Sequence, residues 1–177
     1  LQCHFGMDSL SWAMVGARVT GVDFSPQAIE LARDLSARQQ IPAEFICCDI
    51  YDLPDYLADE FDVVFTSYGV LTWLPDLNRW AEIVAQYIKP GGFFYIAEFH
   101  PFAMTLDDNS TDQQWRIGYD YFDKDVMIFD VKGSYADPTA ETSQPFSYEW
   151  QHTMGDIITA LIRAGLRIQF LHEYDHC

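Results

Sequence analysis

Two acidic residues, each closing an expected β-strand, are the residues best suited to chemistry in this chain. Asp23 ends the segment 19–23, VTGVD, and Asp49 ends the segment 45–49, FICCD. In an open α/β sheet, an acid at the end of the second strand can accept hydrogen bonds from ribose hydroxyls. An acid at the end of the next strand can accept from an adenine amino group. Together the two acids predict an adenosine site.

The turn upstream of Asp23 is the second feature that could bind a ligand. Residues 2–6 read QCHFG, so Gly6 is the one glycine of this turn. Glycine usually serves in such turns because it permits tight turning and close approach of the backbone to a nucleotide. The segment contains no G-x-G-x-x-G pattern, which argues against a nicotinamide dinucleotide site.

Strands and helices alternate over the first 98 residues and would position these groups. Strands are expected at 17–23, 43–48, 61–66 and 93–97, and the last of these is apolar throughout, as in a strand covered on both faces. Ser25 and Pro26 are a typical helix start, and the helix after them repeats apolar residues at helical spacing. The alternation predicts an α/β fold: a Rossmann-like, doubly wound, mostly parallel sheet with helices on both faces.

The carboxyl ends of parallel strands lie at one edge of a sheet, where ligands bind in this fold class. The segments expected at this edge are 2–6, 23–25, 49–50, 66–68 and 98–100. Their convergence predicts a single cleft.

The helical periodicity stops at His100-Pro101. Residues 101–152 are acidic and aromatic, and we interpret them as a β-rich insertion after the fifth strand. Residues 126–135 are expected to be extended, and Asp137-Pro138 to form a turn. The insertion is expected to be a lid over the cleft or the contact of a homodimer. A helical face at 157–162 and a final strand at 166–170 follow.

Composition narrows the function classes. The 177 residues suit one domain, 1–177, whose first strand would precede Leu1. A net charge of −17 argues against nucleic acid as the main partner. No apolar run approaches the roughly 18 residues of a membrane span. The four cysteines show no C-x-x-C spacing, so we expect no metal site and a cytoplasmic protein.

The ordered segments resemble the class I S-adenosylmethionine-dependent methyltransferases of the small-molecule type. The resemblance rests on the turn 2–6 and on GVDFSP at 21–26, CDI at 48–50, FDVV at 61–64, VLTWL at 70–74 and KPGG at 89–92. The first motif of that family usually reads D-x-G-x-G-x-G. Here Gln2 and His4 stand at the first two glycine positions, and Gly6 matches the third.

The resemblance implies S-adenosylmethionine as the cofactor and assigns roles by position. Asp23 would accept from the ribose hydroxyls, Phe24 would pack on the adenine, Asp49 would accept from its amino group, and the Ile50 backbone would contact the ring edge. Thr66, Ser67 and Tyr68 would line the methionine portion. The full set of implied cofactor residues is Gln2, Cys3, His4, Gly6, Asp23, Phe24, Ser25, Asp49, Ile50, Thr66, Ser67 and Tyr68.

Methyl transfer to a small-molecule acceptor is an in-line displacement at a sulfonium methyl, for which an enzyme mainly supplies alignment. A base is needed where the acceptor must lose a proton. His100, just past a strand end, is the first candidate for this role, with Tyr68 beside it, and Glu98 and His152 are further candidates. Trp73 is expected to pack under the cleft.

Two other functions remain open at this point. The altered first turn is also compatible with a relative of the fold that binds or senses a ligand without methylating it. A nicotinamide oxidoreductase is the third and weakest alternative, because the dinucleotide motif is absent.

Overall fold

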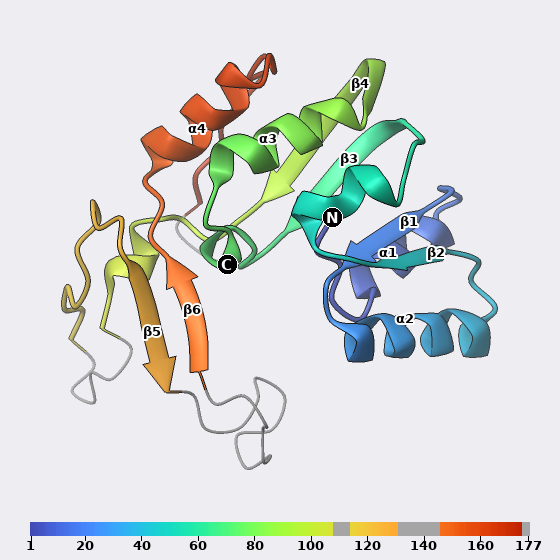
Figure 1. Cartoon of the computed structure of the whole chain (residues 1–177), viewed down its shortest axis with the longest axis horizontal. Helices are drawn as coiled ribbons and strands as arrows, with labels where there is room; N and C mark the ends of the chain where they lie inside the picture. The colour runs from blue at the N-terminus through green and yellow to red at the C-terminus, as the bar shows by residue number, and fades with distance from the viewer. Residues whose placement is uncertain (108–113, 131–145, 175–177) are drawn as a thin grey trace.

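A computed structural model describes residues 1–107, 114–130 and 146–174 of the chain (Figure 1). The strands in these ranges form three two-stranded sheets. Strand β1 (Thr20–Asp23) is parallel to β2 (Glu44–Cys47), and β3 (Phe61–Ser67) is parallel to β4 (Ile88–Ala97). Strands β5 (Val126–Asp130) and β6 (Phe146–Trp150) form an antiparallel pair. The helices are α1 (Met7–Met14), α2 (Pro26–Gln39), α3 (Leu77–Gln86) and α4 (Met154–Arg163).

The first three residues join the two parallel pairs. The Leu1 amino group donates to the Phe65 carbonyl of β3 over 2.6 Å, and the Cys3 N–H donates to the Val22 carbonyl of β1 over 2.8 Å. Leu1–Cys3 therefore lies between β1 and β3, and the turn that follows reaches the carboxyl ends of both strands.

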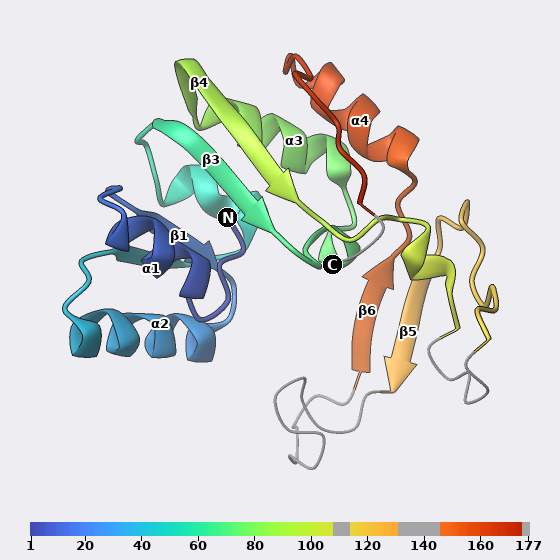
Figure 2. The same ribbon diagram turned by 180° about the vertical axis from the view of Figure 1, so that it is seen from behind.

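Helices lie on both sides of the strand layer, which confirms the expected layering: α3 and α4 pack on one face of β3 and β4, and α1 contacts the other face at β3 (Figures 1 and 2). Trp12 of α1 packs edge-on against Phe65, with ring centroids 5.6 Å apart. Trp80 of α3 packs edge-on against Phe94, also at 5.6 Å. Phe65 pairs with Tyr95 in the ladder, and Phe94 precedes Tyr95, so the two contacts lie on opposite faces.

The apolar run 93–97 is not covered on both faces, contrary to expectation. Phe94 and Ile96 pack against the main core, whereas Phe93 is 55% exposed and Tyr95 is 43% exposed. The reason is that α3 and α4 pack on the face that carries Phe94 and Ile96, while the ring contact from α1 falls on Phe65 of the neighbouring strand. The continuous apolar run 93–97 therefore belongs to a strand that is covered on one face and exposed on the other.

The main core lies between β3–β4 and the layer of α3 and α4. Trp80, Val84 and Leu53 are fully buried there, with Ile157 and Leu161 of α4 beside them. A smaller core joins α2 to β1 and β2 through Ile29, Ala32 and Phe45 and their neighbours. The two cores fix the strand pairs whose ends form the site.

The insertion contains a β-hairpin, as expected in part. Strands β5 and β6 pair from Val126↔Trp150 to Asp130↔Phe146. Residues 131–135 of the expected extended segment, and the expected Asp137-Pro138 turn, lie outside the described residues. The final strand expected at 166–170 is not formed. Phe170 still lies beside Tyr95, with ring centroids 6.4 Å apart, so ring packing holds this segment near β4 without a strand ladder.

Candidate active site

The turn 2–6 keeps a glycine-like backbone at positions that are not glycine. Gln2 and His4 have φ angles of +46° and +49°, and Gly6 has +79°. Left-handed conformations are unfavourable for residues with a Cβ and are concentrated at functional sites. At Gly6 a side chain is also excluded by space, since an added Cβ would lie 2.8 Å from Cε1 of Phe45. The backbone path of the turn is therefore retained although two glycines are replaced.

Asp23 is fixed by this turn and by the start of α2. It is 7% exposed, and its Oδ2 accepts from the His4 N–H over 2.8 Å. Its Oδ1 accepts from the Ser25 N–H over 3.0 Å, and Ser25 in turn caps α2 by accepting from the Ala28 N–H over 3.2 Å. A carboxylate oxygen has two lone pairs, so each oxygen keeps one for a further donor. This geometry suits a vicinal diol such as ribose.

An exposed aromatic ring follows Asp23 directly, and the neighbouring strand β2 brings a second acid near it. Phe24 follows Asp23 and is 72% exposed, so its ring is free to pack on a ligand. Asp49 is exposed two residues past β2, and its Oδ1 accepts from the Tyr51 N–H over 2.9 Å. Ile50 is only 6% exposed and its side chain belongs to the main core, which leaves its backbone as the part available to a ligand.

A contact across the site involves an acid that the sequence did not single out. Ser67, at the end of β3, donates to Oδ2 of Asp8, in the first turn of α1, over 2.5 Å. Asp8 is exposed and is one of 27 acids, so no pattern distinguished it. The tertiary structure brings it to the strand end that was expected to meet the methionine portion.

Thr66, Gln2 and Cys3, all implied cofactor residues, are less accessible than Phe24 or Tyr68. Thr66 is fully buried, and its hydroxyl has no hydrogen-bond partner among the described residues. The Gln2 amide is likewise buried and unpaired in the part of the chain that the structure covers. Burial raises the pKa of the Cys3 thiol to about 11, so this cysteine is a neutral packing group at neutral pH.

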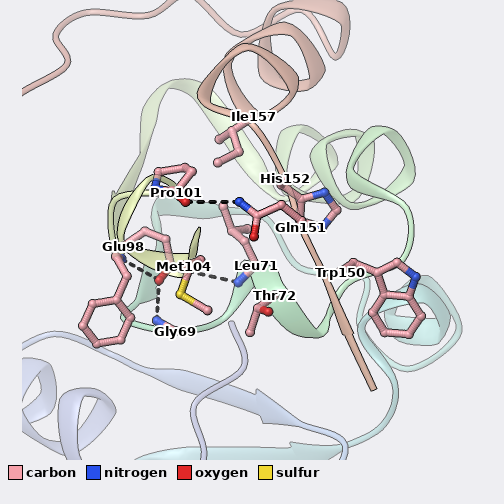
Figure 3. Close-up of a pocket in the computed structure, with 11 residues that line it drawn as sticks. Gly69, Leu71, Thr72, Glu98, Pro101, Met104, Trp150, Gln151, His152 and Ile157 are labelled. Carbon is pink, nitrogen blue, oxygen red and sulfur yellow. Dashed lines mark hydrogen bonds between the residues drawn. The ribbon is translucent and has the colours of Figure 1, made fainter. Parts of the chain in front are cut away.

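Tyr68 and Glu98 follow directly after β3 and β4, and Figure 3 shows the Glu98 carboxylate beside Gly69 and Leu71. Tyr68 is 61% exposed and has a φ angle of +21°. The Glu98 carboxylate accepts from the backbone N–H groups of Gly69, Val70, Leu71 and Phe99, the last three over 2.8, 3.0 and 2.7 Å. Because these donors occupy both oxygens, Glu98 is engaged in building the loop and is not free to take a proton.

His100, the first candidate for a base, has both ring nitrogens engaged. Its Nδ1 accepts from the Phe102 N–H over 3.1 Å, which places the proton of the neutral ring on Nε2. Nε2 lies 2.6 Å from Oε1 of Glu173. In this conformation neither ring nitrogen of His100 has a free lone pair that could take a proton from the methyl acceptor. Trp73, expected beneath the cleft, is 50% exposed.

His152 lies where the insertion meets the core (Figure 3). Its Nε2 lies 2.8 Å from the Leu74 carbonyl, and burial lowers its pKa, so the ring is neutral at pH 7. It lines a cavity of about 30 Å³ beside Glu98 and also a groove of about 630 Å³ between α3, α4 and β6. The cavity has room for one or two water molecules, whereas the groove is in the size range of ligand pockets.

The turn, Asp23, Asp49 and Ser67–Tyr68 thus lie at the carboxyl ends of the two parallel pairs, as the strand-end argument predicted. The single cleft stays a prediction, because neither the cavity nor the groove is lined by the turn, Asp23 or Asp49. Within the described ranges, no three histidine, cysteine or acidic residues are grouped to hold a metal ion. None of the helices in these ranges is long and apolar enough to cross a membrane.

Comparison with known proteins identifies the family. Residues 1–96 match the sequence profile of a family described as methyltransferase domain, which is more than half of the 177 residues. The chain belongs to this methyltransferase family. The resemblance drawn from the turn and the strand-end motifs is confirmed by this match.

Curated relatives of this methyltransferase domain match the same amino-terminal part. The ubiquinone biosynthesis O-methyltransferase of Coxiella burnetii is 36% identical over 95 residues, which are 54% of this chain and 40% of that protein. The protein of the same name from Chromobacterium violaceum is 28% identical over 95 residues, with the same shares. The match thus spans about two fifths of the length of these relatives.

Solved structures support the fold over nearly the whole chain. An S-adenosylmethionine-dependent methyltransferase from Clostridium acetobutylicum superposes with a TM-score of 0.69 at 16% identity, covering 96% of this chain and 72% of that one. The PH0226 protein of Pyrococcus horikoshii gives a TM-score of 0.63 at 20% identity, covering 92% and 69%. The methyltransferase domain therefore has the Rossmann-like α/β fold predicted from its strand and helix alternation.

Proposed function

We propose that this protein transfers a methyl group from S-adenosylmethionine to a small-molecule acceptor. The observation that carries the proposal is the position of Asp23. It is held by the N–H groups of His4 and Ser25, with one lone pair left on each oxygen for a ribose diol. Family membership supports the same cofactor class.

Residues on both sides of Leu1–Cys3 fit the parts of this cofactor. On the β1–β2 side, Asp23 would hold the ribose and Asp49 the adenine amino group, beside the exposed ring of Phe24. On the β3 side, Ser67 and Tyr68 would face the methionine portion. When bound, the cofactor supplies a sulfonium methyl for in-line displacement, and the role of these residues is to align it.

The charge of the domain suits a cationic cofactor. S-adenosylmethionine carries a sulfonium and an ammonium charge against one carboxylate. The chain has a net charge of −17, and Asp8, Asp23 and Asp49 all lie at the proposed site. Complementary charge raises the local concentration of a ligand and its association rate.

The acceptor would be recognised mainly by the carboxyl-terminal half. The cavity beside Glu98 and the groove beside His152 are lined largely by residues after position 96, where the family match ends. The name O-methyltransferase says that the curated relatives methylate an oxygen atom, and we do not carry this type of acceptor over to this chain. His152, neutral at pH 7 and lining both spaces, is a better-placed candidate for proton uptake than His100.

Calorimetric titration of the intact protein tests the proposal. We expect S-adenosylhomocysteine, the demethylated cofactor, to bind with a one-to-one stoichiometry, and NADH to give no heat of binding. Absence of binding by folded protein at millimolar S-adenosylhomocysteine contradicts the proposal, and a preference for NADH revives the oxidoreductase alternative.

We further propose that the protein is cytoplasmic and that the 101–152 insertion covers the cleft or contacts a second copy. Cys3, Cys47 and Cys48 are free thiols, which suits a reducing compartment. One face of the hairpin is apolar and exposed, with Ile128 at 56% and its partner Tyr148 at 50%. Sedimentation velocity separates the two roles: a dimer favours the contact, and a monomer favours the lid.

A further inference from the structure

Glu98 provides the hydrogen-bond acceptors that the loop after β3 lacks. The β3–β4 ladder ends with the pair Ser67↔Ala97, and Tyr68 adds one more bond to the Ala97 carbonyl over 2.7 Å. Beyond Tyr68 the carboxylate of Glu98, and not the backbone of β4, accepts the hydrogen bonds of the loop. Its two oxygens accept from three successive N–H groups of the loop, at Gly69, Val70 and Leu71.

The shape of the loop explains why one carboxylate can satisfy three donors. Gly69 has a φ angle of +72°, and Val70 is right-handed helical with φ −92° and ψ −42°. Alternation of left- and right-handed residues turns successive N–H groups toward one point, which makes an anion-binding concavity. The 3₁₀-helix Leu71–Trp73 starts here without a side-chain cap of its own, so Glu98 also supplies its cap from another strand.

The same loop fixes Tyr68 in a strained conformation. Tyr68 has a φ angle of +21°, and its ring packs against Phe99 with centroids 6.0 Å apart. The Phe99 N–H is itself the fourth donor to Glu98, over 2.7 Å. An unfavourable backbone conformation persists only where surrounding contacts enforce it. Glu98 supplies those contacts on both sides of Tyr68.

We propose that Glu98 is a positioning residue that holds the loop 68–71 in the conformation that receives the methionine end of the cofactor. This inference rests on the proposed function. The adenosine end is expected at Asp23 and Asp49, which belong to the other strand pair and make no contact with Glu98 among the interactions described. Loss of Glu98 therefore weakens binding of the amino-acid end selectively.

Two ligands separate the two ends of the site. S-adenosylhomocysteine carries the amino-acid group, whereas 5′-methylthioadenosine has the same adenosine and sulfur without it. In Glu98→Gln, an amide N–H₂ faces backbone donors that need an acceptor. We expect the Kd of S-adenosylhomocysteine to rise about tenfold or more, as for unsatisfied polar groups, and that of methylthioadenosine to change less than about threefold.

Matched variants make the result specific. Glu82→Gln, on the exposed face of α3, makes the same chemical change away from the loop and should leave both affinities unchanged. Gly69→Ala distorts the loop while keeping Glu98, because the backbone is left-handed and the added Cβ would lie 3.3 Å from the Phe99 ring. It should reproduce the selective loss, and it decides the question if Glu98→Gln does not fold.

The outcomes are distinguishable. If wild-type protein binds neither ligand, the proposed function fails. If wild type binds both and the Glu98 and Gly69 variants weaken both equally, in step with a lower melting temperature, the role of Glu98 is general stability and the inference is overturned. Unchanged affinity for both ligands in the folded variants also overturns it.

Discussion

The backbone N–H of His4 donates to Oδ2 of Asp23 over 2.8 Å, which joins the altered glycine turn to the acid at the end of β1. The two features that point most directly to nucleotide chemistry are thus one structural unit. The left-handed backbone of His4, with φ +49°, is what aims its N–H at the carboxylate. The backbone of residue 4 therefore holds Asp23 in place, whatever side chain residue 4 carries.

Replacing His4 by glycine separates the backbone role from the side-chain role. A left-handed non-glycine residue costs roughly 1–2 kcal/mol, which exceeds the roughly 0.5–1 kcal/mol of extra chain entropy that glycine loses on folding. We expect His4→Gly to keep or slightly raise the free energy of unfolding, measured by urea denaturation. A loss of more than about 1 kcal/mol would mean that the His4 ring contributes packing beyond its contact with Phe5.

Asp23→Ala should weaken cofactor-product binding and loosen the turn. The variant removes the acceptor for the His4 and Ser25 N–H groups as well as the proposed ribose ligand. We expect S-adenosylhomocysteine affinity to fall by about 1–3 kcal/mol in calorimetric titration. Asp34→Ala is the control, because Asp34 pairs with Arg38 on the surface of α2. Equal affinity in wild type and the Asp23 variant would remove Asp23 from the site.

Thr66→Val tests whether Thr66 lines the methionine portion, as its sequence position suggested. The Thr66 hydroxyl is buried without a described partner, and valine has the same shape without a polar group. We expect the free energy of unfolding to rise by about 1 kcal/mol and S-adenosylhomocysteine affinity to stay unchanged. Thr66→Ala, which also leaves a cavity, should instead lower stability. A large loss of affinity in the valine variant would place the hydroxyl on the cofactor.

His152 should make stability depend on pH near neutrality. Burial lowers its pKa in the folded state from the value of 6.5 in the unfolded chain. Below that value the unfolded state binds more protons than the folded state, so stability is lost as the pH falls from about 6.5 toward the lower pKa of the folded state. In thermal melts, His152→Gln should show a smaller drop in melting temperature than wild type on acidification from about pH 7.5 to 5.5. His172→Gln, at an exposed histidine, should follow wild type.

The elements that carry the proposed cofactor site could be predicted from the sequence. Ser25-Pro26 marked the start of α2 correctly, because helix capping depends on a few adjacent residues. The strand end at Asp23, and the end of β2 two residues before Asp49, followed from alternating strands and helices, which fix chain direction and therefore bring these ends to one edge. The family expectation rested on the same segments and is confirmed by the match over residues 1–96.

Coverage of the sheet and the last strand could not be predicted. Phe93 and Tyr95 are aromatic like Phe94, so the sequence does not distinguish the face that a helix covers from the exposed face. The segment 166–170 has alternating apolar residues, yet a strand also needs an open neighbour in hydrogen-bond register, and there only ring packing by Phe170 is seen.

The sequence by itself determined the fold class and the family, and it indicated the two acids proposed for an adenosine site, because these depend on local periodicity and on short motifs in order. The tertiary structure decided how the turn works and which candidates are free to act. Left-handed Gln2 and His4, the Asp8–Ser67 contact and the occupied oxygens of Glu98 all arise from contacts between segments far apart in the chain. Such contacts leave no periodic trace in the sequence. The turn that lacks two glycines thus keeps their backbone conformation because its surroundings enforce it.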